Sequence, residues 1–109
     1  ADDIIYICDD IEDGAKKGYI DWEMEYVNLK KKVRSQPGCA DKFDNLFDDI
    51  ENKNQGIDNK MDPSEQRVAK VRNFRNLSKF KYKIRNLYCY FSYNLLYYNY
   101  QIKGVAYHG

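Results

Sequence analysis

The chain has 109 residues, 43% of them hydrophobic and 16% aromatic, which is enough for one buried core and too little for two. No window approaches the roughly 18 consecutive apolar residues of a membrane span, and no charged-then-apolar signal segment opens the chain. We therefore expect a single domain over residues 1–109, not embedded in a membrane.

The cysteine and histidine content excludes several classes of site. Cys8, Cys39 and Cys89 are an odd number, lie far apart and form no C-x-x-C pair, so a secreted disulfide scaffold is not expected. We expect at least two of them to be buried unpaired thiols in a reducing cytoplasm. The single His108 excludes a multi-histidine metal site, and the chain has no Gly-rich phosphate loop and no G-x-S-x-G motif. No metal or cofactor is expected.

The formal net charge of +1 conceals an uneven distribution along the chain. All 17 acidic residues lie between Asp2 and Glu65, where nine basic residues leave a net charge of −8. The other nine of the 18 basic residues follow Glu65, without any acid, and give +9. Residues 1–65 therefore form an acidic part, and residues 66–109 a basic part whose field attracts polyanions.

Most of the aromatic residues also lie in this basic part, from Phe74 to Tyr107. Basic side chains hold phosphates and aromatic faces stack on bases, so the mixture favours single-stranded RNA or DNA as a partner. The alternative is that the basic part pairs with the acidic part inside the fold, or with another protein. Composition leaves both interpretations open.

In chain order, the first predicted elements are a strand and a turn. Residues 4–8 are β-branched and aromatic and are bounded by acids, which is typical of a short buried strand. Residues 9–14 are predicted to be a solvated acidic turn. They do not match a calcium loop, because Ile11 occupies a ligand position of the EF-hand pattern.

Two to three helices are predicted next. Apolar residues at steps of three and four form a first stripe, and residues 35–38 end that helix. A second stripe runs up to Gly56, a plausible stop. Asp62 as N-cap, Pro63 after it and Glu65 at the third position begin a third, short helix. The predicted inward residues of the three are Tyr19, Trp22, Tyr26, Leu29 and Val33; Phe43, Leu46, Phe47 and Ile50; and Val68, Val71 and Phe74.

From Lys79 the apolar period changes to two, which is the spacing of a strand. Lysines and Arg85 alternate with Phe80, Tyr82 and Ile84, and turns are predicted near residue 86 and at residues 92–94. Alternation resumes over residues 96–102 and a closing strand follows. The predicted fold is therefore α+β: an N-terminal strand, two to three helices, and a three-stranded antiparallel β run packed on the helices.

The remaining candidate chemistry is that of Lys, Arg and Tyr on strands. Metal-free RNA cleavage needs a group that takes the 2′-OH proton, cations that hold the phosphate and a donor for the leaving oxygen. Lys81, Lys83 and Arg85 on one strand face, beside tyrosines of neighbouring strands, are of suitable type. The alternative is a solvated cationic face with half-buried tyrosines. The adjacent acids at positions 9–10 and 48–49 are interpreted as solvated.

Three segments resemble the RelE-like and HigB-like toxins of bacterial and phage toxin–antitoxin systems. Residues 80–85 (FKYKIR) resemble that family's strand with an aliphatic-Arg pair, residues 88–91 (YCYF) its next aromatic strand, and residues 102–109 its closing apolar strand. Leu87 departs from the pattern, because it stands about where a second arginine is expected. The resemblance implies a strand, two helices and an antiparallel run of strands, with metal-independent mRNA cleavage on the ribosome and neutralisation by an acidic antitoxin.

Under this resemblance Arg85 would clamp phosphate, Lys81 and Lys83 would be cationic or acid–base residues, and Tyr88 or Tyr90 would stack on bases. The candidate catalytic residues are Lys81, Lys83, Arg85 and Tyr88. The candidate nucleic-acid-binding residues are Arg67, Lys70, Arg72, Arg75, Lys79, Tyr90 and Lys103. The alternative function is a non-enzymatic phage or mobile-element protein that binds and inhibits a host protein or nucleoprotein, and the abundance of Asn, Lys, Tyr and Ile suits such an AT-rich source.

Overall fold

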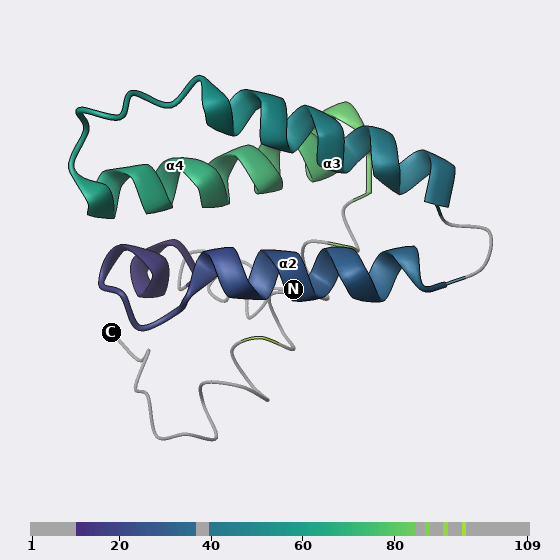
Figure 1. Cartoon of the computed structure of the whole chain (residues 1–109), viewed down its shortest axis with the longest axis horizontal. Coiled ribbons are helices and arrows are strands. Elements are labelled where there is room, and N and C mark those ends of the chain that lie inside the picture. Colours follow the sequence, from purple (N-terminus) through teal and green to yellow (C-terminus); the bar gives the residue numbers. More distant parts are fainter. Residues whose placement is uncertain (1–10, 37–39, 85–86, 88–90, 92–94, 96–109) are drawn as a thin grey trace.

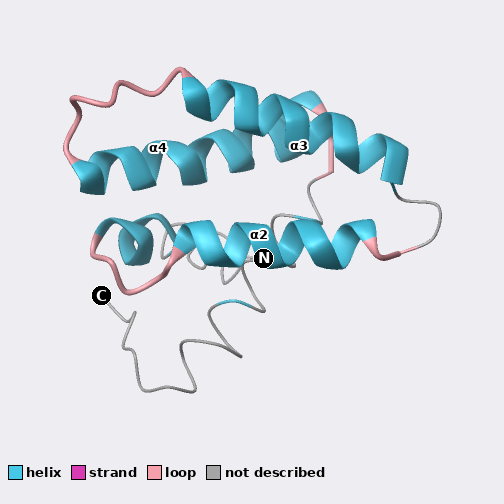
Figure 2. Cartoon of the chain, viewed as in Figure 1, coloured by secondary structure: helices cyan, strands magenta, loops and turns pink. Residues whose placement is uncertain are grey.

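The structure is a computed structural model that describes residues 11–36, 40–84, 87, 91 and 95, and within them every regular element is a helix. These elements are α2 (Trp22–Arg34), α3 (Ala40–Gln55), α4 (Pro63–Asn76) and the π-helix η1 (Leu77–Lys81). Residues 11–16 are also helical. Figure 2 shows helices and loops in this part and no strand. The predicted α+β fold is therefore wrong for the described part of the chain.

Helices α2, α3 and α4 lie side by side, and successive helices run in opposite directions (Figure 1). Helix α3 packs against both α2 and α4, and η1 continues from α4 along α3. The short helical segment at residues 11–16 lies at the end of the bundle where α2 and α4 begin. This arrangement places the acidic α3 and the segment 11–16 beside the basic α4.

Helix α2 forms where the sequence predicts it. The Asp21 side chain caps it by accepting a hydrogen bond from the backbone N–H of Met24 at 3.3 Å. Acidic residues in the first turn and basic residues in the last turn suit the helix dipole. The helix ends at Arg34, directly before the predicted stop. Trp22, Tyr26 and Val33 are buried as expected, whereas Tyr19 precedes the helix and is exposed.

The other two predicted helices are also confirmed. Helix α3 ends at Gln55, immediately before Gly56. Helix α4 begins after Asp62, whose side chain accepts a hydrogen bond from the backbone N–H of Ser64 at 3.1 Å, with Pro63 in the first turn. The predicted inward residues of α4, Val68, Val71 and Phe74, are buried.

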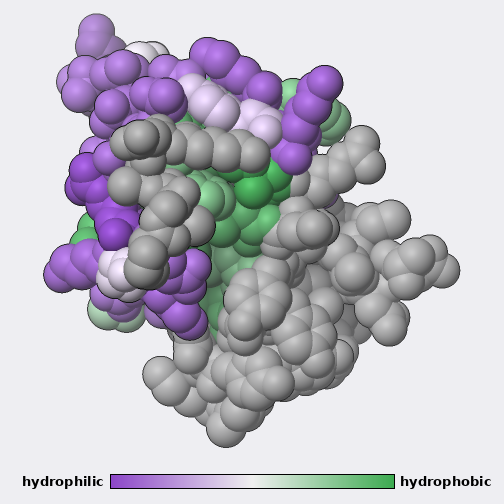
Figure 3. Space-filling view, turned by 90° about the vertical axis from the view of Figure 1, so that its right-hand side faces the viewer, coloured by the Kyte–Doolittle hydropathy of each residue, from purple (hydrophilic) through white to green (hydrophobic). Residues whose placement is uncertain are grey.

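Aromatic rings from three helices meet in the core. The Phe74 ring of α4 lies 5.5 Å from the Trp22 ring and 6.2 Å from the Tyr26 ring of α2, both edge to face. The Tyr26 ring lies 5.8 Å from the ring of Phe47 in α3. Each such pair stabilises the fold by about 0.5–1.5 kcal/mol beyond burial of its area. Figure 3 shows hydrophobic residues in a central hollow with hydrophilic residues above and beside it.

The predicted acidic turn at residues 9–14 is wrong from residue 11 onward, because residues 11–16 are helical. Ile11 and Ala15 are four residues apart and both are fully buried, so one face of this turn of helix belongs to the core. Gly18 then turns the chain toward α2 with a φ of +80°, a conformation that side chains with a Cβ rarely adopt. The sequence pattern did not reveal this apolar face, because the segment is short and the predicted turn at residues 9–14 is rich in acids.

The predicted sheet over residues 79–108 is contradicted wherever it can be compared. Residues 77–81 form the π-helix, and Leu87, Phe91 and Leu95 have helical backbone and pack in or against the core. These three residues are spaced four apart. That spacing places them on one face of a helix, and because it is even it would also place them on one face of a strand. Tyrosine favours strands only where it packs on a half-buried sheet. The abundance of tyrosine was therefore not sufficient evidence for strands in this part of the chain.

The predicted strand at residues 4–8, the closing strand and all three cysteines lie outside the described residues. Their predictions stay open.

Candidate functional site

The basic face of α4 is the part of the predicted site that the structure describes best. Arg67, at the start of this face, donates hydrogen bonds from Nε to the carbonyl oxygen of Ala15 at 2.8 Å and from Nη2 to that of Lys16 at 2.9 Å. These carbonyls end the helical segment 11–16, where the intrahelical donors run out, and the Ala15 carbonyl also accepts a hydrogen bond from the Gly18 N–H at 3.3 Å. Arg67 therefore holds the N-terminal segment on α4.

The next two arginines of this face share one acid. Glu12 Oε1 lies 2.6 Å from Arg75 Nη1, and Glu12 Oε2 lies 3.4 Å from Arg72 Nε. The Glu12 side chain is 16% exposed, so these ion pairs are partly shielded from water. Lys70 of the same helix pairs with Glu23 of α2. The four cations of α4 that were predicted to hold phosphate thus contact acids or carbonyls of the acidic part.

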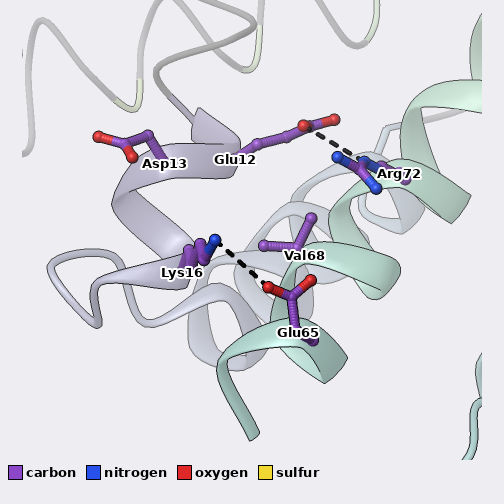
Figure 4. A pocket seen from close by; sticks show the side chains of 6 residues that line it. All are labelled: Glu12, Asp13, Lys16, Glu65, Val68 and Arg72. Carbon is purple, nitrogen blue, oxygen red and sulfur yellow. Dashed lines mark hydrogen bonds and ion pairs between the residues drawn. The ribbon is translucent and has the colours of Figure 1, made fainter. Parts of the chain in front are cut away.

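A polar pocket of about 210 Å³ lies between the segment 11–16 and α4 (Figure 4). Two ion pairs cross it: Glu12 with Arg72, and Lys16 with Glu65, whose charged atoms are 3.3 Å apart. Asp13 points away from both pairs in Figure 4. The lining residues are Glu12, Asp13, Lys16, Glu65, Val68 and Arg72. Because three acids and two bases line it, the pocket offers no net positive charge to a phosphate.

Lys81, a predicted catalytic residue, lies at the end of η1 and pairs with α3. Its Nζ donates a hydrogen bond to Asp49 Oδ2 at 2.8 Å, and the Tyr82 hydroxyl donates to the same oxygen at 2.5 Å. The hydrogen bond from Lys81, followed by that from Tyr82, lowers the pKa of Asp49. The hydrogen bond with Asp49 raises the pKa of Lys81 above its ordinary value. A raised pKa keeps the amine protonated, which opposes a role as general base.

A similar polar cluster joins α2 to α3. The Tyr26 hydroxyl donates a hydrogen bond to Glu51 Oε2 at 3.0 Å, and Lys30 Nζ donates to the same oxygen at 2.8 Å. Burial, followed by the charge of Glu51, raises the pKa of Tyr26 far above its ordinary range. This tyrosine stays neutral and serves the packing of the two helices.

The predicted row of cations on alternate strand residues is not present. Lys79 and Lys81 lie in η1, and Lys83 follows with a left-handed φ of +56°. Three such residues do not share one face as they would on a strand. Arg85, Tyr88, Tyr90 and Lys103 lie outside the described residues, so their predicted roles stay predictions.

Sequence reasoning missed three residues that this geometry makes important. Glu12 and Asp49 were interpreted as solvated acids, yet each receives two basic or hydroxyl partners. Phe80 was predicted to point inward from a strand and is 69% exposed. One feature of the sequence could have indicated a helix here. Val68, Val71, Phe74 and Leu77 follow one another at steps of three, so the apolar stripe of the helix continues almost to Lys79, where the strand was predicted to begin.

Among the described residues, no helix is both long and apolar enough to cross a membrane. Nor do three or more His, Cys, Asp or Glu side chains gather there as ligands for a metal ion. No protein-family model, curated protein or solved structure matches the chain. The resemblance to RelE-like and HigB-like toxins therefore stays an interpretation of the sequence, without the strands that it implies in the part that can be compared.

Proposed function

We propose that this protein is a non-enzymatic binding protein that acts through contacts with another protein. The observation that carries the proposal is the internal use of the basic residues in α4 and η1. Arg67 binds carbonyls of the N-terminal segment, and Lys70, Arg72, Arg75 and Lys81 pair with acids of residues 12–49. These five cations of the acid-free stretch are thus partnered within the fold, and their attraction for polyanions is correspondingly weaker.

Exposed apolar side chains support the same proposal. Tyr19, Met24 and Val27 lie exposed at or near the start of α2, and Phe80 lies exposed on η1. Aromatic residues and methionine are enriched in protein–protein interfaces, where they fill pockets of the partner. RNA cleavage has less support, because Lys81 is paired with Asp49 and does not share a strand face with Lys83, the other catalytic candidate in the described part of the chain.

The test separates protein from RNA as the partner. Tagged protein is recovered from a native extract, with and without ribonuclease treatment, and bound protein and RNA are both identified. We expect one specific protein to co-purify in a constant ratio to the tagged chain, and we expect that ratio to be the same after ribonuclease treatment. In parallel, labelled oligouridylate is titrated against the purified chain at increasing salt. Tight binding that weakens with a slope of about −0.7 per phosphate contact, or shortening of the oligonucleotide, would overturn the proposal.

A further inference from the structure

Phe80 is the most exposed of the large hydrophobic residues in the described part of the chain. Its exposed fraction is 69%, against 55% for Tyr19 and 49% for Met24. A single exposed apolar residue is ordinary on a protein surface and needs no explanation by itself. What distinguishes Phe80 is the backbone that presents it.

The chain before Phe80 is fixed in a π-helix. Leu77 and Ser78 are buried, and the Ser78 hydroxyl donates a hydrogen bond to the carbonyl oxygen of Phe74 at 2.5 Å. The Tyr82 N–H donates to the Leu77 carbonyl at 2.9 Å, which closes the wide turn over Phe80. Single π-helical turns are rare and occur frequently at functional sites.

The chain after Phe80 is fixed as well. The Tyr82 hydroxyl donates a hydrogen bond to Asp49 of α3, and its oxygen lies 3.1 Å from the carbonyl oxygen of Asn45 on the same helix. Lys83 has a φ of +56°, a left-handed conformation that costs a residue with a Cβ about 1–3 kcal/mol when the surrounding structure imposes it. Phe80 is therefore held outward between two anchored points, and binding would not have to order its backbone.

The stretch of chain around Phe80 is basic. Lys81 and Lys83 follow Phe80 closely in sequence, and both are exposed. Asp49 neutralises Lys81 but leaves Lys83 without an acid among the described residues. A partner that receives Phe80 thus meets positive charge at the edge of the contact, and acidic side chains complement that charge.

We propose, on the basis of the proposed function, that Phe80 is the anchor of a protein contact and packs against a segment of the partner in which apolar side chains lie beside acidic ones. One rigid aromatic packed on apolar side chains, with few charges at the edge of the contact, is the arrangement of an interface hot spot. Single-stranded nucleic acid instead uses several aromatic platforms along a groove of available cations. The described cations of α4 that precede Phe80 contact acids or carbonyls.

The probe is a displayed library of short peptides selected on the purified full-length chain, with peptide affinities then measured by fluorescence anisotropy. We expect selected peptides to combine acidic residues with adjacent apolar ones. Phe80→Ala should weaken their binding by at least about tenfold. Met61→Ala, which truncates another exposed apolar side chain far along the chain from Phe80, should change it less than about twofold. Lys83→Gln should weaken binding modestly and reduce its salt dependence. The circular dichroism of all variants should match the parent, because no substituted side chain is buried.

The outcomes separate the role of Phe80 from the proposed function. Peptides that bind Phe80→Ala as tightly as the parent would overturn the role of Phe80 and leave the protein-binding function standing. Selection of basic peptides, or of no peptide, would contradict the proposal that the partner presents acidic residues. Binding of oligouridylate that depends on Phe80 would overturn both the inference and the proposed function. Self-association that is lost in Phe80→Ala, measured by sedimentation, would replace the acidic partner by a second copy of the chain.

Discussion

At the scale of single residues, Asp49 shows how position changes the meaning of a side chain. In the sequence it is one of two adjacent acids on a predicted helix. In the structure, Lys81 and Tyr82 both donate hydrogen bonds to its Oδ2 atom, whereas Asp48 beside it is exposed and makes no ion pair with a described residue. The two carboxylates therefore have different effects on the stability of the fold, although the sequence gives no reason to distinguish them.

We predict that Asp49→Asn lowers the thermal midpoint near neutral pH and that the deficit disappears in acid. The hydrogen bonds lower the pKa of Asp49 in the folded state, so its contribution to stability is complete above the ordinary value of 3.8. That contribution is lost as the pH falls through the lowered pKa, because the parent is then protonated too. Thermal melts of parent and variant across this range measure the difference. Asp48→Asn is the matched control and should show a smaller deficit at every pH; an equal deficit would contradict the role of Asp49.

At the scale of elements, the ion pairs of Glu12 connect the N-terminal helical segment to α4. The segment buries only a short apolar face, with Ile11 and Ala15, so the arginines contribute a larger share of its attachment than they would for a long helix. Surface ion pairs contribute little, but Glu12 and Arg75 have side-chain exposures of 16% and 24%. Their interaction is shielded and is expected to persist at moderate salt.

A double-mutant cycle measures this connection. We predict that Glu12→Gln and Arg75→Gln each destabilise the protein and that their coupling energy is about 1 kcal/mol or more, from the range for neighbouring residues. Denaturant unfolding of the parent, both single variants and the double variant provides the values. The same cycle on the exposed pair of Asp13 and Lys17 should give a smaller coupling energy, because water screens that pair. Equal coupling energies in the two cycles would show that the Glu12–Arg75 pair stabilises the fold no more than an exposed ion pair does.

At the scale of the whole molecule, stability depends on the aromatic core where the helices meet. Phe74 is fully buried, and its ring lies within 5.7 Å of the Trp22 and Phe91 rings. It therefore joins α2, α4 and a residue from the region beyond η1. Removal of this ring leaves a cavity that three separate parts of the chain would have to close.

We predict that Phe74→Ala lowers the free energy of unfolding by about 3–5 kcal/mol, the usual range for a buried phenylalanine. Phe80→Ala removes the same ring from an exposed position and should change it by less than about 0.5 kcal/mol. Denaturant melts followed by far-ultraviolet circular dichroism compare the two. Comparable losses would mean that the ring of Phe80 is packed in the fold.

The sequence by itself determined α2, α3 and α4, because their apolar stripes, the Asp62 cap and the stops after Arg34 and Gln55 are local features. It also determined that the acidic and basic parts carry opposite charge, and it left open whether they pair with each other. Only the tertiary structure decided the rest. Leu87, Phe91 and Leu95 suit a strand or a helix by spacing, and the core beside Trp22 and Phe74 selects the helix. The partners of Glu12 and Asp49 lie more than 30 residues away in the chain, and no local pattern encodes contacts at that separation.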